Sequence, residues 1–99
     1  MTFVVRIDPP ALQDIQEAID WYELQKEGLG ERFYNYLEKS LKQLELNPYF
    51  QIRYSGIRCL SLLTFPFMIH YTIDQTNSIV IVRAVLNTSM NPAKWKDRG

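Results

Sequence analysis

Two arginines interrupt stretches of the sequence that are otherwise largely apolar. Arg58 follows Ile57, and Arg83 lies within the run Ile79 to Leu86. A buried charge is costly unless it is paired, so each guanidinium needs a carboxylate, solvent at the sheet edge or an anionic ligand. The planar guanidinium fork binds two phosphate oxygens at once, so phosphate is the anion that it suits. For Arg58 a structural and a functional role fit equally well, and for Arg83 a functional role is favoured.

His70 is the only histidine and, by residue type, the natural acid–base group near neutral pH. Along its strand it shares parity with Met68 and Thr72, opposite Ile69 and Tyr71. This alternation predicts that His70 is an ordinary histidine on a solvent-facing or partner-facing surface. We expect Tyr71 to lie in the core with its hydroxyl at the rim.

No pattern in the sequence points to a metal or a cofactor. Cys59 is the only cysteine, and no cluster of cysteine and histidine has the spacing of metal ligands. The carboxylates of the first predicted helix, Asp14, Glu17, Asp20 and Glu23, have no histidine or metal set beside them. We therefore predict no cofactor and interpret these carboxylates as a solvated helix face.

The elements that position these residues follow from hydrophobic periodicity. Spacings of three and four residues predict helices over 11–26 and 31–46, and the Gly28-Leu29-Gly30 turn makes them an antiparallel hairpin. Asp8 offers an N-cap oxygen for the first helix. The helix residues predicted to face the sheet are Leu12, Ile15, Ile19, Phe33, Leu37, Leu41 and Leu44.

Alternating and β-branched runs predict four strands, at 2–7, 57–64, 67–73 and 78–88. The stretch 49–56 shows no clear period and is predicted to be an irregular link. The resulting order is β-α-α-β-β-β. It predicts an α+β fold, in which one domain over residues 1–99 forms a small antiparallel sheet with the two-helix hairpin on one face.

Composition and charge narrow the class of protein. The sequence is 46% hydrophobic and 13% aromatic, which disfavours disorder, and no stretch has the roughly 20 apolar residues of a membrane span. It opens without a basic, apolar leader, so we expect a cytoplasmic protein. Residues 1–50 carry five Lys/Arg and nine Asp/Glu, whereas residues 51–99 carry six and two. We expect the sheet side to be the more positive surface.

Seven short motifs follow one another along nearly the whole chain. They are Ala11 and Ile15 after a proline-bearing turn, Trp21-Tyr22, Gly28-Leu29-Gly30-Glu31-Arg32-Phe33, Leu44…Asn47-Pro48, Gly56-Ile57-Arg58, Phe65-Pro66-Phe67…Ile69…Tyr71 and Pro92…Trp95…Arg98. In this order and spacing they resemble the RelE/ParE superfamily of toxins, and they are closer to its ParE side.

The resemblance implies the toxin of a type II toxin–antitoxin, or plasmid-stabilisation, system. Its implied partners are a cognate antitoxin and a cellular target, with a homo-oligomer as a state without antitoxin. RelE-type members cleave messenger RNA in the ribosome, whereas ParE-type members act against DNA gyrase without known nuclease chemistry. We expect the antitoxin to dock along an apolar groove, as a helix or as an added strand.

The C-terminal segment departs most from the family pattern. Members often read His-Gly-Arg-Arg-Asp-Pro before the final tryptophan, whereas residues 87–92 here are Asn-Thr-Ser-Met-Asn-Pro. The imidazole and both arginines are absent, so a non-enzymatic toxin is favoured. In a nuclease, Arg58 and Arg83 would be catalytic. The predicted target or RNA contacts are Arg53, Tyr54, Asn87, Lys94, Trp95, Lys96 and Arg98.

Three functions stay open at this point. The leading one is a growth-inhibiting toxin that blocks an essential target such as DNA gyrase. The second is a ribosome-dependent endoribonuclease that needs no metal. The third is a degenerate family member that acts only as an interaction or dimerisation module.

Overall fold

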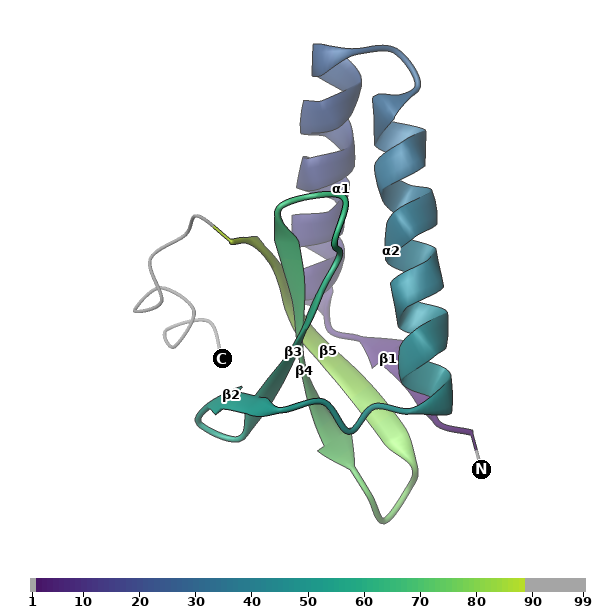
Figure 1. Ribbon diagram of the computed structural model, residues 1–99, viewed down its shortest axis with the longest axis vertical. Coiled ribbons are helices and arrows are strands. Elements are labelled where there is room, and N and C mark those ends of the chain that lie inside the picture. Colours follow the sequence, from purple (N-terminus) through teal and green to yellow (C-terminus); the bar gives the residue numbers. More distant parts are fainter. Residues whose placement is uncertain (1, 89–99) are drawn as a thin grey trace.

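The computed structural model describes residues 2–88, which form two helices and five strands (Figure 1). In chain order the elements are β1 (Val4–Ile7), α1 (Pro9–Gln25), α2 (Leu29–Leu46), β2 (Ile52–Tyr54), β3 (Ile57–Ser61), β4 (Phe67–Asp74) and β5 (Ile79–Asn87). The helices lie side by side on one face of the sheet (Figure 1). The predicted α+β class and its helical hairpin are confirmed.

The two helices begin and end within two residues of their predicted limits. Two prolines start α1, where their fixed φ suits the first turn. Gly28 precedes α2 in the left-handed region, with φ 87°, which glycine adopts without strain. Gly30 lies inside α2 rather than in the turn, and a Cβ there would come within 2.6 Å of the Ile19 carbonyl oxygen of α1. Glycine at this position therefore allows the helices to approach closely. Within residues 2–88, neither helix is long and apolar enough to cross a membrane.

The sheet is mixed, with the strand order β1-β5-β4-β3-β2. Strands β3, β4 and β5 pair antiparallel as predicted, and the additional strand β2 pairs antiparallel with β3. In contrast, β1 pairs parallel with β5, with Val4 opposite Ile79 and Ile7 opposite Val82. Local periodicity identifies a strand but does not specify the direction of a partner that is distant in the sequence. The prediction of a wholly antiparallel sheet was therefore wrong for β1.

The stretch 49–56, predicted to be an irregular link, contains the short edge strand β2. It turns into β3 through Ser55 and Gly56, which have φ values of 43° and 75°. Two successive residues with positive φ suit a tight hairpin. Ile52 and Arg53 are both exposed, so the strand shows no alternation in the sequence.

Most of the residues predicted to face the sheet do so. Ile15, Phe33, Leu37 and Leu44 are buried in the main core, and Ile19 and Leu41 pack against it while partly exposed. Leu12 was assigned wrongly, since it is 54% exposed. Ala11 and Ala18 occupy the buried face of α1 instead. A small side chain lets the helix lie close to the sheet, but periodicity weighted towards large apolar residues overlooks it.

A β-bulge interrupts the pairing of the two central strands. His70 lies opposite Ala84 and Tyr71 opposite Val82, so Arg83 has no partner in the register. One additional residue reverses the alternation of a strand beyond it. Val82 and Val85 consequently both pack in the core beneath the helices. Both faces of β5 are largely covered, and the bulge reverses its alternation. Together these two features explain why odd and even positions of β5 are both apolar.

Candidate functional site

Arg83, at the bulge, is held by a carboxylate. Its Nη1 lies 2.8 Å from Oδ2 of Asp8, and its Nε donates to the hydroxyl of Thr72 at 3.2 Å. The sequence predicted that the Asp8 side chain caps α1. It does not, because its carboxylate binds this arginine instead. The guanidinium thus links the junction of β1 and α1 to the centre of the sheet. This structural role is sufficient to explain why a charged residue occurs in an otherwise apolar strand.

Arg58 is engaged by the connection between α2 and β2. Its Nη1 donates to the carbonyl oxygen of Phe50, and its guanidinium carbon lies 5.5 Å from the centre of the Tyr49 ring. In the register Arg58 pairs with Tyr71, which is part of the core under the helices. Arg58 therefore points towards the helix side of the sheet.

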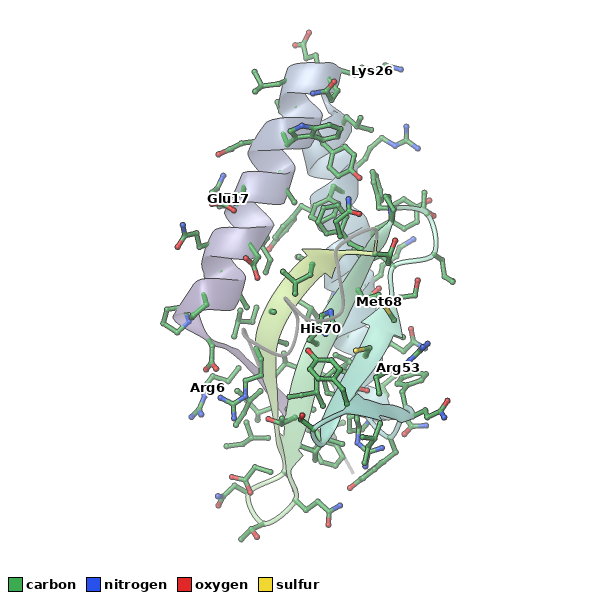
Figure 2. The ribbon with its side chains drawn as sticks, turned by 90° about the vertical axis from the view of Figure 1, so that its left-hand side faces the viewer. Arg6, Glu17, Lys26, Arg53, Met68 and His70 are labelled. Atoms are coloured by element: carbon green, nitrogen blue, oxygen red, sulfur yellow. The ribbon has the colours of Figure 1, made fainter. Side chains whose placement is uncertain are left out.

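The two candidate catalytic arginines point to opposite faces of the sheet. Arg58 shares a face with Tyr71, whereas Arg83 binds the side chain of the next residue, Thr72. Arg53 and Arg6 lie at opposite edges, in β2 and β1, with His70 and Met68 between them (Figure 2). Arg58 and Arg83 therefore do not share one face of the sheet, and the expected positive sheet side stays a prediction. Lys94, Trp95, Lys96 and Arg98 lie outside the described residues.

His70 is fully buried, so its prediction as a surface residue was wrong. Its Nδ1 lies 2.9 Å from the hydroxyl of Tyr54 and 3.3 Å from Sγ of Cys59. The predicted parity is confirmed, because Cys59 and His70 pair on the face away from the helices. That face carries a second small core of Ile57, Cys59 and Met68, with Tyr54 packed against it. Strand alternation predicts the face but not its burial.

The buried cysteine and tyrosine both keep their protons at neutral pH. Burial raises the pKa of the Cys59 thiol to about 11, with the charge of Arg53 lowering it in part. The Tyr71 hydroxyl donates to the Pro48 carbonyl at 2.7 Å, and burial raises its pKa to about 12. Tyr71 lies in the core as predicted, but its hydroxyl is buried rather than at the rim. The Cys59 thiol is consequently a poor nucleophile.

A groove of about 460 Å³ lies between α1 and the open end of the β4–β5 hairpin, where β4 begins and β5 ends. Its lining residues are Asp14, Glu17, Ala18, Trp21, Tyr22, Pro66, Phe67, Val85, Leu86 and Asn87. The carboxylate of Asp14 accepts a hydrogen bond from the backbone N–H of Val85 at 3.1 Å. The solvated-face interpretation is therefore wrong for Asp14, while Glu17 is exposed as predicted.

The predicted contact residues that the structure describes do not form one site. Among residues 2–88, no group of three His, Cys, Asp or Glu side chains could hold a metal ion. Of the predicted contact residues, Arg53 and Tyr54 lie in β2, whereas Asn87 lines the groove beside α1. Sequence reasoning missed this groove. The exposed Trp21 was its main signal, but a tryptophan alone does not specify which strands lie beside it.

Comparison with known proteins gives a consistent result. Residues 5–92 match the sequence model of the ParE toxin of the type II toxin–antitoxin system parDE. The chain resembles a solved structure of the chromosomal ParDE system of P. aeruginosa, with 13% identity over 87% of this chain and 96% of that one, and a TM-score of 0.76. No curated protein matches the chain.

Two further structures share the fold. The RelBE2 toxin–antitoxin complex of Mycobacterium tuberculosis has 16% identity over 88% of this chain and 99% of that one, with a TM-score of 0.65. The isolated RelE toxin of E. coli has 14% identity over 96% and 94%, with a TM-score of 0.66.

Proposed function

Because the chain belongs to the ParE toxin family of type II toxin–antitoxin systems, we propose that it inhibits DNA gyrase without enzymatic activity and is neutralised by a cognate antitoxin in the cytoplasm. The observation that carries the non-enzymatic part is the placement of Arg58 and Arg83 on opposite faces of the sheet. The ParE match over most of the chain favours gyrase over the ribosome as the target.

Cleavage of RNA without a metal requires several groups around one phosphate. A base must take the proton of the ribose 2′-hydroxyl, cations must stabilise the phosphoryl oxygens, and an acid must protonate the leaving oxygen. Here the two arginines diverge, and His70 is fully buried beside Tyr54. Asn87 stands where the family often has a histidine, and an amide cannot deliver a proton.

An antitoxin partner is the second part of the proposal. The P. aeruginosa and M. tuberculosis structures both come from toxin–antitoxin systems, and the second is described as a toxin–antitoxin complex. The groove beside α1 offers an apolar surface for such a partner. We expect a homo-oligomer when the antitoxin is absent.

Two assays on the purified protein separate the candidate targets. We expect inhibition of gyrase supercoiling, reversed by the antitoxin encoded in the neighbouring reading frame. In a ribosome-programmed messenger cleavage assay we expect no codon-positioned cutting. Cutting by the wild type that is lost in Arg83→Ala would replace the gyrase proposal with ribonuclease activity.

Induced expression in cells provides an independent readout. A gyrase inhibitor should arrest DNA replication first, whereas a ribosome-directed toxin should arrest translation first. Normal growth after confirmed expression of folded protein would support a degenerate family member that serves only as an interaction module.

A further inference from the structure

We propose that the groove between α1 and the end of β5 binds an extended segment of the antitoxin that carries a lysine or arginine next to an apolar side chain. This inference rests on the proposed function, because it takes the antitoxin as the partner. It goes further by assigning the docking surface on this chain and the chemistry of the segment that fills it.

The charges of the groove specify a cationic partner. Asp14 and Glu17 line one wall, and none of the residues that line the groove is a lysine or arginine. They lie three residues apart on α1 and so share one side of the helix. Glu17 is exposed and lies midway along α1 (Figure 2). A Lys or Arg side chain of a partner would pair with this wall.

The apolar part of the groove lies one helical turn away. Trp21 is 57% exposed and packs edge-on against Tyr22, at a distance of 5.0 Å between ring centres. Ala18 and Phe67 extend the apolar wall. An exposed tryptophan beside a groove is the type of residue that contributes most to protein interfaces. A partner side chain seated here would be aliphatic or aromatic.

The spacing of these two features fits an extended chain. Glu17 and Trp21 are four residues apart on α1, which corresponds to about 6 Å along the helix axis. Alternate side chains of a strand are about 6.6 Å apart on one side. A strand whose cation faces Glu17 would therefore place the side chain two residues away against Trp21.

The edge of β5 beside the groove is covered in part by α1. β1 pairs with β5 only as far as Val82, and within residues 2–88 no strand lies against 83–87 on that side. The backbone N–H of Val85 on this edge is bonded to the Asp14 side chain. This donor is therefore already used, so side chains of the groove would hold the extended segment, without an added-strand hydrogen bond at Val85.

The first test uses the full-length protein and a displayed library of random 12-residue peptides as the probe. We expect selected peptides to carry a Lys or Arg two residues from an apolar side chain. Glu17→Lys and Trp21→Ala should each weaken their binding about 5- to 10-fold. Glu27→Lys and Leu24→Ala are matched controls, since both residues are exposed and outside the groove, and they should leave affinity unchanged.

The second test measures the complex with the antitoxin from the neighbouring reading frame. A complex weakened by Glu17→Lys and Trp21→Ala, and not by the two controls, supports the docking surface. A tight complex insensitive to both groove variants overturns the inference but leaves the proposed function intact. If no complex forms with the wild type, the antitoxin part of the proposed function fails together with the inference.

Two further outcomes identify a different occupant or mode. If Trp21→Ala abolishes self-association of the free protein in sedimentation experiments while the antitoxin binds normally, the groove is an interface between two copies and the proposal is wrong. Selected peptides without a cation, or with affinities that do not change with salt, would overturn the assigned chemistry. Unchanged circular dichroism spectra of the variants would exclude misfolding as the cause of lost binding.

Discussion

The carboxylate of Asp8 lies 2.8 Å from the guanidinium of Arg83, although the two residues are 75 positions apart in the chain. Their side chains are 25% and 37% exposed, so solvent screens part of the interaction. A double-mutant cycle with Asp8→Ala and Arg83→Ala should give a coupling free energy of about 0.5–1 kcal/mol in urea unfolding. Purely additive effects would show that the pair contributes nothing to stability.

The faces of the helices can be tested with two leucines. Leu37 is fully buried in α2, so Leu37→Ala should lower the free energy of unfolding by about 2–5 kcal/mol. Leu12→Ala removes an exposed side chain and should change it by less than about 0.5 kcal/mol. The measurement is chemical denaturation of both variants. Equal losses would contradict the orientation of α1.

Tyr71→Phe removes the hydroxyl that donates to the Pro48 carbonyl. That carbonyl also accepts the N–H of Phe50, so it keeps one partner, and the expected loss is about 0.5–1.5 kcal/mol. This loss is to be measured by urea unfolding at neutral pH.

The same variant should alter the dependence of stability on pH. Burial raises the pKa of Tyr71 from 10.0 to about 12, so the folded state holds this proton more tightly than the unfolded state. The resulting stability is complete below pH 10 and is lost as the pH rises towards 12. The decline over this range should be shallower in Tyr71→Phe, and a decline of equal steepness would contradict the assignment.

The thiol of Cys59 should be protected from reagents in the folded protein. With a pKa of about 11 instead of 9.0, its thiolate is roughly 10²-fold scarcer at pH 8. Labelling by a thiol reagent should be slower by at least this factor in native protein than in urea. Similar rates in the two states would show that the cluster with His70 opens readily.

The periodicity of the sequence predicts the helices and most strands because each depends on local pattern. The bulge at Arg83 depends instead on how β5 registers against β4, which no single strand encodes. The burial of His70 likewise depends on a second core on the far face of the sheet. Both features are tertiary, so local alternation could not reveal them.

The candidate site was less predictable than the fold, for a related reason. Arg58 and Arg83 were identified as charges that require partners, which the structure provides through Phe50 and Asp8. Their side chains point to opposite faces of the sheet because of the bulge in β5, and the sequence does not reveal that bulge. The groove joins α1 to strand residues about 70 positions later, and only the folded chain brings these together.

The position of β5 has a consequence for how the protein is made. It is the last strand of the described chain to be synthesised, yet it lies between β1 and β4 in the sheet. A nascent chain that stops before Ile79 leaves β1 without any strand to pair with, and the valines of β5 are missing from the core. Folding of the sheet is thus delayed until β5 has been synthesised, because the contacts that close the sheet span most of the described residues. A ribosome that stalls or terminates early releases a fragment without the toxin fold.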